Sequence, residues 1–268
     1  MTKQGDELRN QTNRPLFFLW VLSALSIVSS VSGAFSELGS VLKISAMLGL
    51  CLFAINNWLS VRKDNDDTLT AIAGLTSLAL LFSVVGDVIN LNLLDQFYGY
   101  SLIIKHDYLA DSVWFFAPAY AAFMVACWLW LRVYKIGYWY FALSLVGGGV
   151  LGSLSYLSMM RTGTSGYVLY MTFFYAAFIT LPTVFAFWFM YVATKHPVKK
   201  PLFSIAIGLI LATVADALIG QFWLFGNDGQ GYYPLIREVN WLVYFSSQAL
   251  LVQLPRCFNQ AKKTVTIR

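Results

Sequence analysis

Long apolar runs, repeated along the whole chain, limit what this sequence can fold into. Of the 268 residues, 58% are hydrophobic and only 12% are charged, which is outside the range of soluble globular domains. About 20 apolar residues form a helix long enough to cross the roughly 30 Å hydrocarbon core of a bilayer. Eight such runs are present, at 15–33, 38–60, 68–91, 111–131, 136–158, 167–193, 202–225 and 238–255. The sequence therefore predicts an all-α, polytopic membrane protein with eight transmembrane helices.

The distribution of basic residues predicts the orientation of these helices, because cytoplasmic loops are enriched in Lys and Arg. If the N-terminus is inside, fourteen of the eighteen basic residues fall in inner segments and only Lys105, Arg161 and Arg237 in outer ones, while Lys43 lies within the second span. We expect both termini to be cytoplasmic, in a membrane such as the bacterial inner membrane. A cleaved signal peptide is the competing interpretation of the first run, but keeping that run completes an even number of spans.

Several classes of protein find no support in the sequence. Membrane orientation explains the net charge of +5 more simply than a nucleic-acid partner does. The three cysteines, Cys51, Cys127 and Cys257, lie in or beside apolar runs and show no paired spacing, so neither a disulfide framework nor a metal cluster is expected. Glycine-rich phosphate loops and the HExxH, GxSxG and CxxC motifs are absent from the sequence, which removes the usual nucleotide, zinc-protease, serine-hydrolase and redox functions. We expect no metal and no cofactor.

Two aspartates stand inside apolar runs. Asp87 lies in the third predicted span and Asp216 in the seventh, and each follows a small residue, Gly86 or Ala215. An ionisable side chain within a span costs at least about 2.5 kcal/mol, so by default it marks a functional site. A catalytic pair is the favoured interpretation. A proton relay in a transporter and a purely structural pair are the alternatives.

The short match around the two aspartates also suggests an internal repeat. The third and seventh spans both run from inside to outside in the predicted topology. The chain is therefore expected to form a single transmembrane domain with a weak repeat of residues 15–131 and 136–255, the two halves lying parallel.

Other polar residues are spaced so that they could join the aspartates. Asn90 lies three positions after Asp87 and therefore on the same helix face, and Tyr244 and Gln248 are four apart in the last span. Together with Lys43 in the outer half of the second span, these four are the candidate substrate-binding residues. The alternatives are helix-to-helix hydrogen bonding for Asn90, Tyr244 and Gln248, and extension of Lys43 to the outer interface.

The sequence resembles the YhhN-type lysoplasmalogenases. The resemblance is carried by the eight-span layout, the early Lys43, the Phe82-Ser83-x-x-Gly86-Asp87 stretch, Ala215-Asp216-Ala217 and Tyr244-x-x-x-Gln248. It implies an integral membrane hydrolase that cleaves the vinyl ether of lysoplasmalogens. The products would be a fatty aldehyde and glycerophosphoethanolamine or glycerophosphocholine, with Asp87 and Asp216 as catalytic residues.

The chain also departs from that family. Ile44 follows Lys43 where members often have Pro, and the stretch 115–120 lacks the usual His-x-x-Tyr. The family's tyrosine in the sixth span corresponds to Tyr170 or Tyr175, and the sequence does not distinguish them. These departures concern the surroundings of the site more than the two aspartates.

A pair of aspartates suits this reaction. Vinyl ethers hydrolyse once a proton reaches the β-carbon, which leaves an oxocarbenium ion beside the oxygen. One neutral carboxyl group can deliver that proton, while an ionised partner stabilises the cation and directs water onto it. The expected partners are a lysophospholipid substrate and membrane lipid. A proton-coupled transporter of small molecules or lipids, using the same aspartates, is the alternative function, and a scaffold without turnover is disfavoured. The sequence does not determine the oligomeric state.

Overall fold

The structure, a computed structural model, is helical throughout the part of the chain that it describes. That part comprises residues 3–32, 36–63, 66–91, 104–160, 165–195, 197, 199–224 and 235–266. The helices are α1 (Lys3–Val31), α2 (Ser36–Val61), α3 (Asp67–Asn90), α4 (Ile104–Leu131), α5 (Tyr138–Met159), α6 (Gly166–Ile179), α7 (Leu181–Lys195), α8 (Lys199–Leu218), α9 (Ile236–Leu251) and α10 (Leu254–Thr266). A 3₁₀ turn, η1 (Arg132–Tyr134), follows α4, and a π-helical stretch, η2 (Ile219–Leu224), extends α8. The predicted all-α class is confirmed for these residues.

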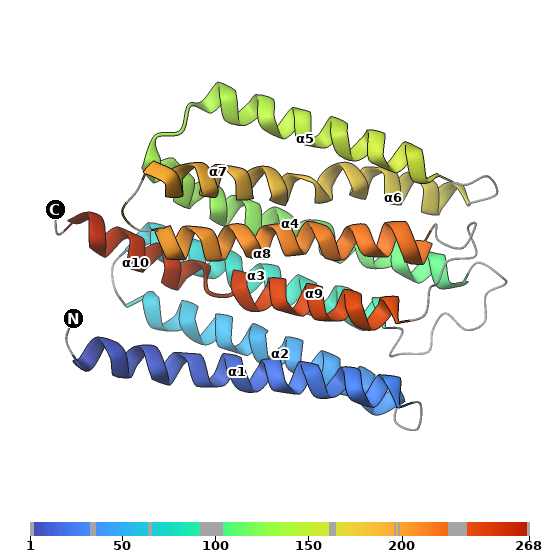
Figure 1. Ribbon diagram of the computed structural model, residues 1–268, viewed down its shortest axis with the longest axis horizontal. Helices are drawn as coiled ribbons and strands as arrows, with labels where there is room; N and C mark the ends of the chain where they lie inside the picture. The colour runs from blue at the N-terminus through green and yellow to red at the C-terminus, as the bar shows by residue number, and fades with distance from the viewer. Residues whose placement is uncertain are drawn as a thin grey trace.

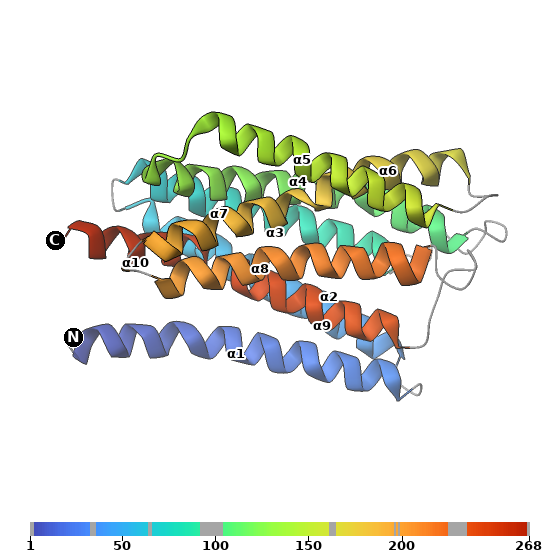
Figure 2. The ribbon, with the colours of Figure 1, turned by 45° about the horizontal axis from the view of Figure 1, so that its top comes forward.

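The helices lie side by side along one axis and form a bundle (Figure 1). In both views α1 forms one edge and α5 forms the opposite edge, with α2, α3, α4, α8 and α9 between them (Figures 1 and 2). The start of α1 and the end of α10 lie at the same end of the bundle, and α3 and α8 both run away from that end (Figure 1). Asp87 and Asp216 are therefore carried on parallel helices.

Seven spans in the described residues are long and apolar enough to cross a membrane, which makes this an integral membrane protein. They are Arg14–Val31, Glu37–Val61, Asp67–Asn90, Ala110–Tyr134, Tyr138–Met159, Gly166–Lys195 and Lys199–Phe222. Each overlaps one of the first seven predicted runs. Burial along α3 is periodic. Ser83, Gly86 and Asp87 are all buried, so one face of this helix is turned into the protein.

The sixth predicted span corresponds to the apolar stretch Gly166–Lys195, but the helix there is interrupted at one residue. It divides into α6 and α7 at Thr180. Pro182 has no N–H group to donate to the carbonyl of Phe178, so the helical hydrogen-bond ladder is interrupted there. At the same position the hydroxyl of Thr180 donates a hydrogen bond to the carbonyl oxygen of Gly148 on α5, at 2.7 Å. This hydrogen bond links the turn between α6 and α7 to α5.

The last predicted run, 238–255, also ends earlier than expected. It corresponds to α9, whose 16 residues rise about 24 Å, and the chain then turns at Val252 and Gln253 before α10 begins. Pro255 cannot donate to the carbonyl of Leu251, which explains the break. Because α9 is shorter than the seven spans above, an eighth membrane crossing stays a prediction.

Candidate active site

The two aspartates of the apolar helices are both buried and belong to one cluster. Asp87 on α3 is 2% exposed and Asp216 on α8 is 8% exposed. The charge of Asp216 acts on the carboxyl group of Asp87. That these two residues form one catalytic site, contributed by two halves of the chain, stays a prediction.

Asp87 is held by the last helices of the bundle. The hydroxyl of Tyr244 on α9 donates a hydrogen bond to Oδ2 of Asp87 at 3.0 Å. The Tyr244 ring stands edge-on to Phe116 of α4, with ring centres 6.0 Å apart. Phe116 in turn lies against Gly86, where a Cβ atom would come within 2.9 Å of the ring. The small residue before the aspartate thus allows α4 to approach α3 at the site.

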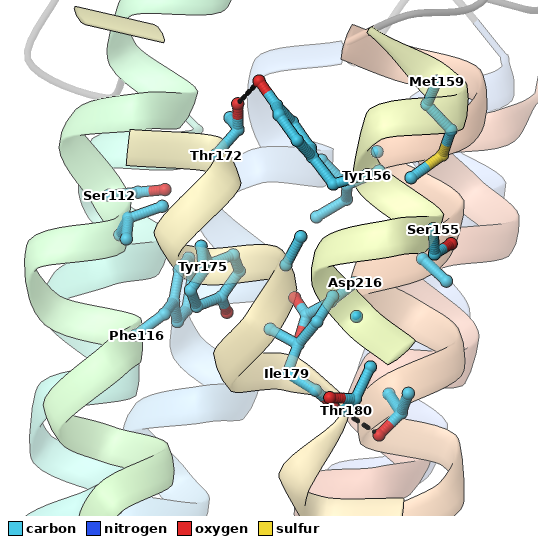
Figure 3. A pocket seen from close by; sticks show the side chains of 17 residues that line it. Ser112, Phe116, Ser155, Tyr156, Met159, Thr172, Tyr175, Ile179, Thr180 and Asp216 are labelled. Atoms are coloured by element: carbon cyan, nitrogen blue, oxygen red, sulfur yellow. Dashed lines mark hydrogen bonds between the residues drawn. The ribbon is translucent and has the colours of Figure 1, made fainter. Parts of the chain in front are cut away.

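Asp216 is surrounded by tyrosine hydroxyl groups. Tyr120 of α4 is buried and Tyr175 of α6 is half-buried, and both act on its carboxyl group. Their ring centres lie 6.5 Å apart. The hydroxyl of Tyr175 points toward Asp216 (Figure 3). Neither hydroxyl has the geometry of a hydrogen bond with it, and both hydroxyls and Oδ2 of Asp216 lack hydrogen-bond partners among the described residues. Groups of this kind are available to a substrate or to water.

A pocket of about 230 Å³ opens beside Asp216. Asp216 is one of its lining residues and Asp87 is not, so the two carboxyl groups differ in their access to it (Figure 3). Ala217, on the exposed surface of α8, lies at its margin. The pocket therefore reaches the surface that a transmembrane helix turns toward lipid. The lining comes from α4, α5, α6, α8 and η2: Ser112, Val113, Phe116, Gly152, Ser155, Tyr156, Met159, Thr172, Tyr175, Ala176, Ile179, Thr180, Thr213, Asp216, Ala217, Ile219 and Gly220.

Lys43 is buried away from the aspartates. Its side chain is 0% exposed, and its Nζ atom lies 5.6 Å from the centre of the Trp241 ring on α9. The charged groups that act on it are Arg237 and Glu238. Complete burial argues against extension of Lys43 to the outer interface. Among the described residues, Lys43 forms no hydrogen bond or ion pair with Asp87 or Asp216, so its predicted role in ordering their carboxyl groups stays a prediction.

Asn90 and Gln248 are predicted site residues whose partners are not defined by the structure. Gln248 is 1% exposed and both polar atoms of its amide lack hydrogen-bond partners among the described residues. The Oδ1 atom of Asn90 likewise has none there. Among the residues that the structure describes, Tyr244 is the only one of the four predicted substrate-binding residues with a hydrogen bond to a carboxylate. The roles of the other three stay predictions.

Tyr120 is a residue beside Asp216 that the sequence analysis did not propose. For the sixth span the sequence left Tyr170 and Tyr175 as alternatives; Tyr175 lines the pocket, whereas Tyr170 is 74% exposed. The spacing in the sequence contains a usable signal. Thr172, Tyr175 and Ile179 are three and four positions apart, which places them on one face of a helix, and all three line the pocket. Tyr120 follows Phe116 by four positions, which places both on one face of α4.

The fold and the site define an integral membrane helical bundle with two buried carboxyl groups, one of which, that of Asp216, lines an apolar pocket. The model of the YhhN family matches residues 38–254, and the chain therefore belongs to the YhhN family. The match extends from α2 to the start of α10 and includes both aspartates and all four predicted substrate-binding residues. Curated proteins and solved structures give no significant match.

Proposed function

We propose that this protein is a lysoplasmalogenase, an integral membrane hydrolase that cleaves the vinyl ether of lysoplasmalogens into a fatty aldehyde and a glycerophospho-alcohol. Membership of the YhhN family fits this activity. The observation that carries the proposal is a buried carboxyl group, Asp216 of α8, at the wall of an apolar pocket, together with a second buried carboxyl group, Asp87 of α3, on which the charge of Asp216 acts.

The pocket suits a single-chain amphiphile that enters from the bilayer. Its walls include apolar side chains such as Val113, Phe116 and Ile179, against which an alkenyl chain buries its surface. Hydroxyl groups of Ser155 and Thr172 also line it and give water a place to bind. The vinyl ether would lie beside Asp216, with the chain extending along the pocket.

Asp216 is the proposed proton donor, because it lines the pocket whereas Asp87 does not. Two carboxyl groups held close together in apolar surroundings do not both ionise readily, so one can remain neutral. Neutral Asp216 transfers its proton to the β-carbon of the vinyl ether, and the π electrons form the new C–H bond. The adjacent carbon and the ether oxygen then share the positive charge of an oxocarbenium ion.

Ionised Asp87 is the proposed stabiliser of that cation, oriented by the hydroxyl of Tyr244. Water adds to the cationic carbon and gives one proton to a carboxylate, which leaves a hemiacetal. Transfer of the hydroxyl proton of the hemiacetal to the glycerol oxygen breaks the C–O bond and releases the aldehyde. The net change is the addition of one water molecule, so the reaction needs no redox partner.

Aldehyde release from detergent-solubilised protein tests the proposal. We expect Asp87→Asn and Asp216→Asn each to reduce turnover of a lysoplasmalogen by at least about a hundredfold, the usual contribution of general acid–base groups. Asp67→Asn, in the first turn of α3, is the matched control and should retain activity. Activity within a few-fold of the unmodified protein in both site variants would refute the assignment. A transporter would instead need sealed vesicles and a gradient, and would release no aldehyde.

We also propose that α9 crosses the membrane, which gives eight spans with both termini cytoplasmic. The start of α1 and the end of α10 lie at the same end of the bundle, which supports this topology (Figure 1). Single cysteines at Lys135 and Ser165, in a protein without its native cysteines, should react with an impermeant thiol reagent from opposite sides. A cysteine in place of Lys262 should be labelled from the same side as the one in place of Lys135. Labelling of that cysteine from the side of Ser165 would contradict the eighth crossing.

A further inference from the structure

A buried lysine on α2, next to α9, has no counter-ion among the described residues. Lys43 is completely buried between α2 and α9, and its Nζ atom has no hydrogen-bond partner or ion pair among the described residues. The Trp241 ring supplies one favourable contact at 5.6 Å. A buried cation is costly unless it is paired, so this ammonium group is in position to receive an anion.

The charges nearest to Lys43 come from the first turn of α9. Arg237 and Glu238 both act on it electrostatically, and both side chains are half-buried. The Nε atom of Arg237 and the Oδ1 atom of Asn240, one turn further on, have no hydrogen-bond partners among the described residues. The region therefore holds two cations, one carboxylate and unused hydrogen-bonding groups.

This charge pattern complements a zwitterion. A phosphodiester carries one negative charge and only accepts hydrogen bonds, as Lys and Arg side chains require. An ethanolamine or choline group attached to it carries a positive charge close by, which a carboxylate can receive. Tyr244, which contacts Asp87, and Arg237 are separated by seven residues of the same helix, or about 10 Å. A lysolipid whose vinyl ether lies at the aspartates would thus extend its headgroup toward the start of α9.

We propose that Lys43 and Arg237 bind the phosphodiester of the lysolipid and that Glu238 binds the ammonium group, so that this region selects zwitterionic headgroups. The proposal rests on the lysoplasmalogenase function for the position of the chain. It assigns the headgroup contacts of the same site, and it adds Arg237 and Glu238 to the predicted substrate-binding residues.

Binding of ether lipids that cannot be hydrolysed tests the proposal separately from catalysis. Three probes share one saturated alkyl chain: a 1-alkyl glycerophosphoethanolamine, a 1-alkyl glycerophosphoglycerol and a 1-alkyl glycerol. Apparent dissociation constants are obtained from thermal stabilisation of the solubilised protein at a fixed detergent concentration. Because saturated ethers lack the double bond, a protein that releases no aldehyde can still be scored for headgroup binding.

The three charged residues have different expected effects. Lys43→Met and Arg237→Gln should each weaken both phosphodiesters by about tenfold, as expected for loss of a charge-assisted hydrogen bond, and leave the 1-alkyl glycerol unchanged. Glu238→Gln should weaken only the ethanolamine lipid, by about threefold to tenfold. If Lys43→Met does not fold, the Arg237 and Glu238 variants decide the question. Equal changes for all three probes, or no change for any of them, would overturn the proposal.

Discussion

The hydroxyl of Tyr244 on α9 donates a hydrogen bond to Oδ2 of Asp87 on α3. These residues are 157 positions apart in the chain, so the last long helix of the bundle orients a carboxyl group carried by the third. Both side chains are buried. A hydrogen bond from a hydroxyl to a carboxylate is stronger than one between neutral groups, and here it fixes the direction in which the carboxyl group faces.

Removal of this hydrogen bond should slow catalysis more than it destabilises the protein. For Tyr244→Phe we expect kcat to fall roughly tenfold to a hundredfold, because hydrogen bonds to charged groups contribute about 1.5–3 kcal/mol. The ring keeps its contacts with Phe116 and Trp241. Aldehyde release and thermal unfolding are measured on the same preparation. Tyr140→Phe, at a 74% exposed position, is the control, and equal activity in the two variants would contradict a positioning role for Tyr244.

The two tyrosines of α6 provide a matched pair for the pocket. Tyr175 lines the pocket and its hydroxyl faces Asp216 (Figure 3), whereas Tyr170 on the same helix is 74% exposed. Tyr175→Phe should therefore reduce kcat/KM by about tenfold or more, as loss of a hydrogen bond to a charged or reacting group does. Tyr170→Phe should leave it unchanged. Steady-state rates of aldehyde release distinguish the two, and a larger loss in the Tyr170 variant would argue against the Tyr175 assignment.

The aspartates could be found from the sequence because a charge inside an apolar run is an exception to the composition of its surroundings. Tyr120 and Tyr175 could not be selected in this way, since the chain contains 15 tyrosines and an aromatic residue suits both the core and the lipid-facing surface. Their role depends on which face of α4 and α6 turns toward Asp216. That choice is made by packing between helices far apart in sequence.

The helix breaks show a similar limit. Pro182 and Pro255 are visible in the sequence, but a proline also occurs inside α4, at Pro118, without ending the helix. Whether a proline ends a helix depends on the tertiary contacts around it, such as the hydrogen bond from Thr180 to the Gly148 carbonyl beside Pro182. The surroundings of Lys43 likewise depend on where the start of α9 packs. Residue type predicted the membrane class and the carboxyl pair, while tertiary contacts decided the remaining details.

Gly86 should tolerate no side chain, because it lies where α3 and α4 meet at the site. A Cβ atom there would come within 2.9–3.0 Å of three atoms of the Phe116 ring, and overpacking of this kind costs about 1–3 kcal/mol. We expect Gly86→Ala to lower the unfolding temperature and to reduce activity, since Phe116 lines the pocket. Gly147→Ala, where nothing lies within 4 Å, should leave both unchanged. Equal unfolding temperatures for the two variants would exclude the proposed crowding.

An ion pair at the opposite end of α3 should make stability depend on pH. Asp66 lies just outside the membrane-spanning segment and caps α3, its side chain accepting a hydrogen bond from the N–H of Leu69 at 3.1 Å. It also pairs with Lys262 of α10, with Nζ and Oδ2 2.7 Å apart. The hydrogen bond from Lys262, reinforced by the one from Leu69, holds the pKa of Asp66 below its ordinary value.

The sign of the effect follows from that lowered pKa. A carboxyl group whose pKa is lower in the folded state stabilises the fold fully above its ordinary pKa of about 3.9, and loses the contribution as the pH falls through the lowered value. Asp66→Asn removes the charge but keeps an oxygen for the cap. We expect it to be less stable than the unmodified protein at pH 7 by at most about 1 kcal/mol, because Lys262 is 52% exposed and the pair is screened by water. Thermal unfolding in detergent from pH 7 to pH 3 should show this difference shrink toward the acid end, and Asp67→Asn is the control. A difference that widens as the pH falls would mean that the charge of Asp66 destabilises the fold.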